Sequence, residues 1–306
     1  MEEANWMHYC ENPKTKQLVL CELKDMKAIQ TWKLNSPYDS LYYFDTAQIK
    51  NFIYFTGGGT PASETSPEQF YQITMRMTIM PSMVTVADKL ANMNVPRANH
   101  TMKVVADKYL YVIGGTNTSG NLSGCEEYDI ASNKWREIAS LNESKKWVSV
   151  CSFKVKHLYA FGGYINDEPK ASSLIETLDI EKPLEKLWEI VKIESGGELF
   201  KDTFLPGVVP IADNCILIFG GITKKEIKDT CVAFDPIKKI LVKKKGILKK
   251  DSFYRTEYGF KADTFGIVGA RDGDLHIYDK TNEKWGLMLK KIWNPDYELA
   301  IKADTY

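Results

Sequence analysis

One phrase recurs along this chain: an apolar run of β-branched and aromatic residues that ends in two glycines. Four copies are intact, and a fifth ends in Gly-Ala instead. The five copies are Phe52–Gly59, Tyr109–Gly115, His157–Gly163, Cys215–Gly221 and Phe265–Ala270. Successive copies lie roughly 50 residues apart, and this period is typical of stacked supersecondary units that cannot bury their hydrophobic faces alone.

The residues between the glycine pairs are also ordered. An aromatic or apolar residue stands next to an aspartate, and a tryptophan follows. The sets are Tyr128 and Asp129 with Trp135, Leu178 and Asp179 with Trp188, Phe234 and Asp235 with Leu241 in the tryptophan position, and Tyr278 and Asp279 with Trp285. The two sets with Tyr-Asp and Trp share one spacing, whereas Trp188 comes three residues later than that spacing predicts.

Each of these residue types has a physical role in such a unit. Paired glycines are expected where φ is positive, or where another backbone leaves no room for a Cβ. The aspartate is expected to accept hydrogen bonds from the amides of a tight turn that follows it. The tryptophan offers a large face that can pack between neighbouring units.

Over most of residues 10–290 this order resembles the kelch repeat, in which a strand ending in Gly-Gly is followed by Tyr-Asp and then by Trp. The alternative is a series of unrelated hairpins, in which four glycine pairs and their ordered partners coincide by chance. The resemblance implies an all-β fold, a kelch-type β-propeller in which each repeat forms one four-stranded blade.

The repeats predict a single propeller domain over residues 1–306, with six blades. The first unit lacks a glycine pair and a first strand, whereas residues 297–303 have the pattern of one strand without a partner. We therefore expect this C-terminal strand to pair into the first blade and to close the ring without a stranded sheet edge. The predicted blades are 5–34 with 297–303, 38–91, 98–140, 147–193, 203–245 and 253–290.

Composition excludes several classes of function. The 40 Lys and Arg residues balance the 40 Asp and Glu residues, which argues against electrostatic capture of nucleic acid or of a membrane surface. Apolar runs stay well below the roughly 18 residues of a membrane span, and the acidic start does not read as a secretory signal. We expect a cytoplasmic protein, with association with the cytoskeleton as an extension of that prediction.

The sequence contains few signs of a catalytic or metal site. The four histidines are far apart and have no metal-ligand spacing, and the six cysteines form no C-x-x-C pair. Motifs for hydrolases, zinc proteases, phosphate loops and dinucleotide binding do not occur. We therefore predict no catalytic residues, no cofactor and no metal. Because some kelch-type propellers are enzymes, a small-molecule enzyme such as a sugar mutarotase remains an alternative.

The resemblance also implies a binding face. The loops after the glycine pairs and the loops that lead into each unit are expected at one rim of the channel, where kelch proteins bind peptides or proteins. Arginines on or beside these loops could hold the carboxylates of an acidic peptide, and aromatic residues there could anchor it. The predicted rim residues are Arg97, Arg255, Arg271, Tyr38, Trp147, Tyr164 and Tyr254. The alternative is that the arginines are solvated or form bridges between blades.

A lysine-rich stretch that includes Lys243, Lys244 and Lys245 covers the expected outermost strand of the fifth predicted blade and its exit. Lysines on the outermost strand of a blade prevent unwanted pairing with other strands, and this is the simpler interpretation. The alternative is a basic patch that docks on an acidic filament.

Together these observations predict a non-catalytic protein–protein interaction module that presents a loop-lined rim to a peptide or protein partner. The first alternative is a structural subunit of a cytoskeletal or ciliary assembly, and the second is the small-molecule enzyme.

Overall fold

The computed structural model describes residues 6–12, 17–24, 27–35, 41, 43–80, 83–165, 170–185, 187–212, 214–223, 228, 230–244, 254–259, 264–269, 275–279, 281–282 and 284–289. Within these ranges every regular element is a β-strand, apart from one 3-10 turn, η1 (Gly197–Leu199). The expected all-β fold class is therefore confirmed.

The longer strands form antiparallel sheets that follow one another in chain order. The first sheet contains β1 (Trp6–Asn12), β2 (Gln17–Lys24) and β3 (Lys27–Asn35). The second contains β4 (Asp45–Ile49), β5 (Phe52–Thr56), β8 (Thr74–Met80) and β9 (Met83–Lys89). The third contains β10 (Thr101–Val105), β11 (Tyr109–Ile113), β14 (Cys125–Asp129) and β15 (Lys134–Ile138).

The remaining sheets repeat this four-stranded order. The fourth contains β16 (Ser149–Phe153), β17 (His157–Phe161), β20 (Ile175–Asp179) and β21 (Glu189–Ile190). The fifth contains β22 (Gly207–Ala212), β23 (Cys215–Phe219), β24 (Cys231–Asp235) and β25 (Ile240–Lys243). The sixth contains β26 (Tyr254–Gly259), β27 (Thr264–Gly269), β28 (Leu275–Asp279) and β29 (Lys284–Leu289).

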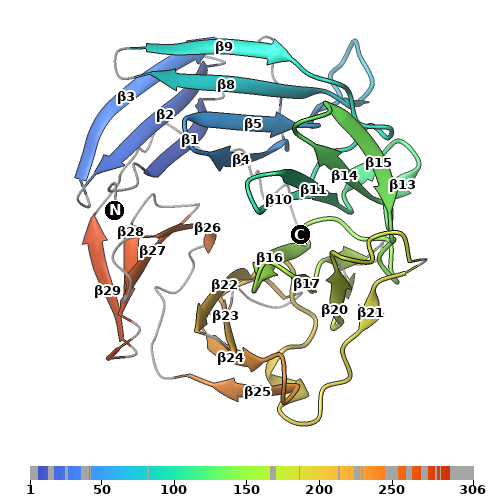
Figure 1. Cartoon of the computed structure of the whole chain (residues 1–306), viewed down its shortest axis with the longest axis vertical. Coiled ribbons are helices and arrows are strands. Elements are labelled where there is room, and N and C mark those ends of the chain that lie inside the picture. Colours follow the sequence, from blue (N-terminus) through green and yellow to red (C-terminus); the bar gives the residue numbers. More distant parts are fainter. Residues whose placement is uncertain are drawn as a thin grey trace.

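The sheets lie around a central axis in chain order (Figure 1), and the first strands of successive four-stranded sheets are neighbours. This arrangement agrees with a kelch β-propeller. The first sheet has three strands in the described part of the chain, one fewer than each of the others. The segment 297–303, which was expected to supply the fourth, lies outside the described residues.

The glycine pairs end the second strand of their sheets, and both expected reasons for glycine apply there. At Gly162 and Gly163 φ is +62° and +106°, a region that disfavours residues with a Cβ. A Cβ on Gly162 would also lie 2.0 Å from the carbonyl oxygen of Thr203, in the loop that leads into the next sheet. The N–H of Gly163 donates to that same oxygen at 3.2 Å, so the pair joins neighbouring sheets.

The aspartates accept hydrogen bonds from the following turn, as expected. The Oδ1 of Asp129 accepts from the N–H groups of Ala131 at 2.9 Å and Ser132 at 3.2 Å. The corresponding oxygens of Asp179, Asp235 and Asp279 each accept at least one amide of their own turn. The aspartate therefore fixes the turn between the third and fourth strands of each of these sheets.

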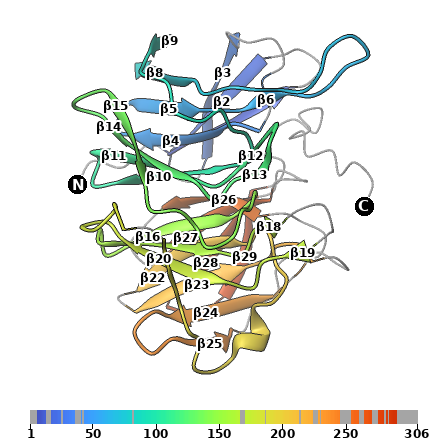
Figure 2. The same cartoon turned by 90° about the vertical axis from the view of Figure 1, so that its right-hand side faces the viewer.

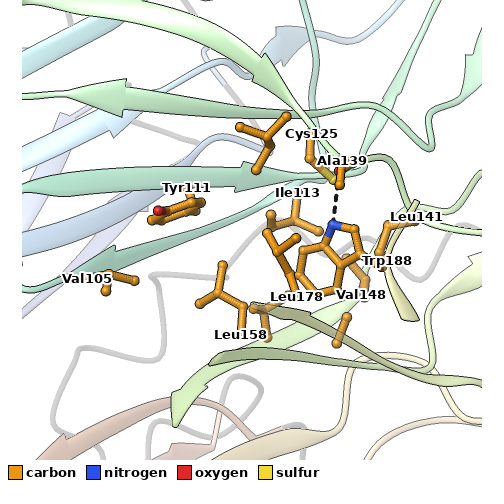
Figure 3. Close-up of a cluster of buried hydrophobic side chains, with 13 residues drawn as sticks. Val105, Tyr111, Ile113, Cys125, Ala139, Leu141, Val148, Leu158, Leu178 and Trp188 are labelled. Atoms are coloured by element: carbon orange, nitrogen blue, oxygen red, sulfur yellow. Dashed lines mark hydrogen bonds between the residues drawn. The ribbon is translucent and has the colours of Figure 1, made fainter. Parts of the chain in front are cut away.

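The tryptophans pack between sheets and bond to the preceding one. Trp188 is buried in a cluster shared by the third and fourth sheets (Figure 3), where Ile113 and Leu178 are among its members. Its Nε1–H donates to the carbonyl of Ala139 at 3.0 Å, just beyond the last strand of the third sheet. Trp135 bonds to the carbonyl of Ala91 at 2.9 Å in the same way. The expected interblade role of tryptophan is confirmed.

Candidate interaction face

The hairpins after the glycine pairs and the loops that lead into the sheets lie on one side of the molecule, here called the loop face. The hairpins are β6 (Gly59–Thr60) with β7 (Gln69–Phe70), β12 (Thr116–Asn117) with β13 (Gly120–Asn121), and β18 (Tyr164–Ile165) with β19 (Lys170–Ala171). Figure 2 labels five of these strands, β6, β12, β13, β18 and β19, and they lie toward the right-hand side of that view. Isolated bridges pair the leading loops of the third, fourth and fifth sheets with the residue after the glycine pair of the same sheet. The pairs are Ala98 with Thr116, Lys146 with Tyr164, and Phe204 with Ile222.

Four residues of the leading loops form a continuous run of backbone hydrogen bonds. The N–H of Asn99 donates to the carbonyl of Tyr43 at 2.8 Å, that of Trp147 to Asn99 at 3.0 Å, and that of Leu205 to Trp147 at 3.2 Å. Each stands two residues before the first strand of its sheet, and each has a positive φ between 54° and 59°. Such φ values in bulky residues cost about 1–3 kcal/mol and concentrate at functional positions.

An aromatic cluster, formed by Trp147, Tyr164 and Phe204, lies on the loop face between the fourth and fifth sheets. The ring centroids are 5.7 Å apart for Trp147 and Tyr164, 5.8 Å for Trp147 and Phe204, and 5.6 Å for Tyr164 and Phe204. Trp147 and Tyr164 are partly buried, whereas Phe204 is buried beneath them. The cluster therefore has an aromatic surface on a packed base.

Neighbouring polar groups hold this cluster in one arrangement. The Nε1–H of Trp147 donates to the Oδ1 of Asn99 at 2.7 Å, and the amide of Asn121 donates to the carbonyl of Tyr164 at 3.0 Å. The ammonium of Lys146 lies over the ring of Trp147 at 4.5 Å and over that of Tyr164 at 5.3 Å. Positive charge therefore accompanies the aromatic surface.

Trp147 and Tyr164 were predicted as anchors from the sequence, whereas Phe204 was not. The signal for Phe204 was its position in the repeat. It precedes Gly221 by as many residues as Lys146 precedes Gly163.

Arg97 lies in the interior and does not offer its guanidinium to a partner. Its side chain is 1% exposed and forms an ion pair at 2.8 Å with Glu126, which is equally buried. It also donates to the carbonyls of Gly114 at 2.8 Å and Gly124 at 2.7 Å. The prediction that Arg97 grips an acidic peptide is therefore wrong in this structure. The guanidinium N–H groups of Arg97 bond to residues of the third sheet and of the loop before β14. Arg97 therefore has a structural role.

The fourth sheet repeats this pair with Lys145 and Glu176, both fully buried and in direct contact. Glu126 and Glu176 also accept the N–H groups of Asn94 and Asn142, so each carboxylate anchors the loop that leads into its own sheet. Neither Lys145 nor the two glutamates were predicted from the sequence. Their signal was a glutamate two residues before the Tyr128 or Leu178 of the repeat.

The fifth sheet has neutral residues at the same two positions, Thr203 and Val232. Both charges are therefore replaced together, so neither partner is left as an unpaired buried ion.

Other predicted rim residues are less well placed or not described. Tyr254 and Arg255 belong to strand β26 rather than to a loop, and Arg255 lies at an irregularity in its pairing with β27. Tyr38 and Arg271 lie outside the described residues. Their binding role stays a prediction.

Lys243 ends β25, the outer strand of the fifth sheet, and its side chain is exposed. The N–H of Lys244 donates to the carbonyl of Cys231 at 2.9 Å, which continues the edge of the sheet. Lys245 lies outside the described residues. Exposed lysines on an outer strand prevent that strand from pairing with a strand of another molecule, so this geometry agrees with the simpler interpretation of the lysine-rich stretch.

Acidification from pH 7 to pH 5 is expected to destabilise the fold in part through His100. Its Nε2 lies 2.9 Å from the Oγ1 of Thr56, between the second and third sheets. Burial, with a smaller contribution from the charge of Arg97, lowers the pKa of His100 from 6.5 to about 3. Because folding favours the neutral ring, this stabilisation is complete above pH 6.5 and is lost as the pH falls toward 3.

The variant His100→Asn removes that titration. Its melting temperature should fall less between pH 7 and pH 5 than that of the unmodified protein, as measured by differential scanning calorimetry. An equal fall in both proteins would exclude His100 as the cause.

Metal-binding groups and membrane-spanning helices are absent from the described part of the chain. No group of three or more His, Cys, Asp or Glu side chains there could hold a metal ion. None of the described segments forms a helix long and apolar enough to cross a membrane.

Comparison with known families identifies the repeat. The model of the KLHDC2/KLHL20/DRC7 Kelch-repeats domain matches residues 43–245, about two thirds of the chain. The chain therefore belongs to the kelch-repeat proteins, as its glycine pairs, aspartates and tryptophans predicted.

Curated relatives resemble parts of the chain. Kelch-like protein 41a of Danio rerio is 29% identical over 147 residues, which are 48% of this chain and 22% of that protein. The kelch repeat-containing protein kel-10 of Caenorhabditis elegans is 25% identical over 148 residues, 47% of this chain and 24% of that protein. Kelch-like protein 9 of Mus musculus is 38% identical over 79 residues, 24% of this chain and 12% of that protein. The matches thus span less than a quarter of each relative.

Proposed function

We propose that this protein is a non-catalytic interaction module that binds a partner protein on its loop face, with the aromatic cluster as the anchor. Membership of the kelch-repeat proteins supports a protein-interaction role in general terms. The observation that carries the specific proposal is the cluster of Trp147, Tyr164 and Phe204. Aromatic anchors of this kind dominate the energetics of protein interfaces.

The backbone at Trp147 supports the same proposal. The φ of +55° at Trp147 is unfavourable for a bulky residue. The corresponding residue of the third sheet is Asn99, and asparagine tolerates this backbone conformation better. Strain of this kind persists where the surrounding structure fixes it, and it presents a side chain in a preset orientation. Preset anchors lose little conformational entropy when a partner binds.

The chemistry of the cluster also suggests a kind of partner. The Lys146 ammonium lies beside the aromatic surface, so a peptide with a carboxylate next to an apolar or aromatic side chain would complement it. The acidic-peptide proposal therefore rests on Lys146 rather than on Arg97. Docking on an acidic filament and a cytoplasmic, cytoskeleton-associated location stay predictions, which cosedimentation and cell fractionation would test.

We also infer that the sheets form six blades closed into a ring. Among the described residues, six larger sheets follow one another around the axis, and the first of them has one strand fewer than the rest. A crystal structure in which residues 297–303 pair anywhere other than with the first sheet would refute this closure.

Replacement of the anchor is the test of the binding proposal. In Trp147→Asn the ring is lost, while the new residue tolerates the same backbone conformation. We expect the amount of the principal copurifying protein to fall about tenfold or more, in line with the loss of a central anchor. The measurement is affinity purification from native cells with quantitative mass spectrometry.

The matched control is Val155→Asn. Val155 has φ of +53° and is exposed in the turn between β16 and β17, at the other end of the strands from the loop face. Its copurifying proteins should match those of the unmodified protein. If Trp147→Asn retains the same proteins in the same amounts as Val155→Asn, the loop-face proposal is wrong.

A further inference from the structure

The hairpin of β6 and β7 is the longest that the structure describes on the loop face. Residues 61–68 separate its two short strands, whereas residues 118–119 alone separate β12 from β13. All side chains of residues 61–69 are exposed, and the loop beside β6 projects from the rest of the ring in Figure 2. Exposed loops of this kind are accessible to the active sites of other enzymes.

This hairpin combines hydroxyl side chains with prolines. Residues 60–67 have the sequence T-P-A-S-E-T-S-P, so that Thr60 and Ser66 each stand directly before a proline. The chain has one further Ser-Pro pair, at Ser36, which lies outside the described residues. Proline-directed protein kinases phosphorylate Ser or Thr in this dipeptide, so the sequence offers two acceptors within one hairpin.

The hydroxyl of Ser66 is placed as a phosphate acceptor must be. Its side chain is exposed and forms no hydrogen bond within the described part of the chain. The N–H of Ser66 donates to the Oγ of Ser63 at 3.1 Å, and its carbonyl accepts the N–H of Ser63 at 2.8 Å, so a turn ends at Ser66. Because Pro67 follows, extended backbone is favoured at Ser66. A kinase can therefore bind the exposed segment that begins there.

Thr60 precedes a proline too, but its environment differs. It belongs to β6, where it pairs with Gln69 of β7, and its side chain is only partly exposed. A kinase would have to separate the two strands before it could bind the backbone around Thr60. The structure therefore distinguishes two hydroxyl groups that the dipeptide alone does not.

A phosphate on Ser66 would meet no counter-ion within the hairpin. Residues 59–70 include Glu64 and Glu68 but neither lysine nor arginine. A phosphoserine adds a charge of about −1.5 to −2 at pH 7. Because all three groups would be exposed, solvent and salt screen the repulsion between them. The modification would thus make the hairpin strongly acidic and leave the fold intact.

We propose that Ser66 is a phosphorylation site for a proline-directed protein kinase. The Ser66 oxygen attacks the γ-phosphorus of ATP, the bond from this phosphorus to the β-phosphate oxygen breaks, and ADP leaves. The hydroxyl proton passes to the catalytic base of the kinase. Phosphorylation is then a means of changing the charge of the loop face without changing the fold.

Phosphorylation of the purified full chain tests the proposal. The chain is incubated with a purified proline-directed kinase, ATP and magnesium, and fragment masses locate each phosphoryl group. We expect modification at Ser66. The variant Ser66→Ala should lose this signal, and Pro67→Ala should lower the rate at Ser66 at least tenfold. The melting temperature of the phosphorylated chain should match that of the unmodified chain.

Two controls separate the structure from the dipeptide. The variant Thr60→Ala should leave the rate at Ser66 unchanged. In a synthetic peptide of residues 57–72, where no sheet restrains Thr60, the same kinase should modify Thr60 as well as Ser66. The proposal is overturned if Ser66 is not modified in the folded chain, or if Thr60 and Ser66 are modified there in the same ratio as in the peptide.

Discussion

Gly162→Ala is expected to lower the free energy of unfolding by about 3–5 kcal/mol, since two penalties combine. The new Cβ would lie 2.0 Å from the carbonyl oxygen of Thr203, and that oxygen belongs to backbone that also accepts the N–H of Gly163. The backbone at Gly162 has φ of +62°, so alanine is strained there even without the collision. Relief requires the leading loop of the fifth sheet to move away from the fourth.

The matched control is Gly124→Ala, directly before β14 of the third sheet. A Cβ on Gly124 would have no heavy atom within 4 Å, and its φ is outside the left-handed region. Its unfolding free energy in urea should change by no more than about 0.5 kcal/mol. If the two variants have the same urea midpoint, close contact at the glycine pairs does not join the sheets.

Lys145→Met is expected to destabilise the protein by about 3–5 kcal/mol, because it leaves the carboxylate of Glu176 buried without its counter-ion. Both side chains are fully buried, and the carboxylate holds the leading loop through the N–H and the amide group of Asn142, at 2.7 and 2.8 Å. Loss of the Lys145 ammonium therefore weakens the hold of Glu176 on the leading loop. Trp147 belongs to this same loop, two residues after Lys145. The measurement is again urea unfolding.

The control for this variant is Lys156→Met, which removes an ion pair of similar composition at the surface. Lys156 and Glu181 are 2.9 Å apart and exposed, and such pairs contribute at most about 1 kcal/mol. The double variant Lys145→Met with Glu176→Met should be more stable than Lys145→Met alone, since it removes the buried charge as well. If Lys145→Met and Lys156→Met lose equal stability, the buried pair has no special role.

The fold could be predicted from the sequence because its determinants are local and repeated. Gly162 and Gly163 end a strand, Asp129 fixes the next turn and Trp188 packs on the preceding sheet, and each role depends on spacing that can be read along the chain. The insertion before Trp188 was also visible as an irregular spacing. That the inserted loop 180–185 lines a cleft against the third sheet was not visible, because this depends on how the two sheets pack together.

The candidate site was predicted less well, because the solvent exposure of a side chain depends on residues that are distant in the sequence. Arg97 occupies a loop, and loops are usually at the surface, yet its partner Glu126 lies 29 positions away and draws it inward. Trp147 and Tyr164 were assigned to one face from the repeat alone. Their contact with Phe204 depends on the fifth sheet lying next to the fourth.

Hydrogen exchange on the isolated complex with its principal copurifying protein tests the central claim most directly. If the loop face binds the partner, amide protection should increase in the leading loops around residues 145–147 and 203–205 and in the hairpin at residues 164–171. The turns at the opposite end of the strands, such as residues 154–156, should be unchanged. Protection confined to those turns or to the outer strands, with the leading loops unaffected, would contradict the account.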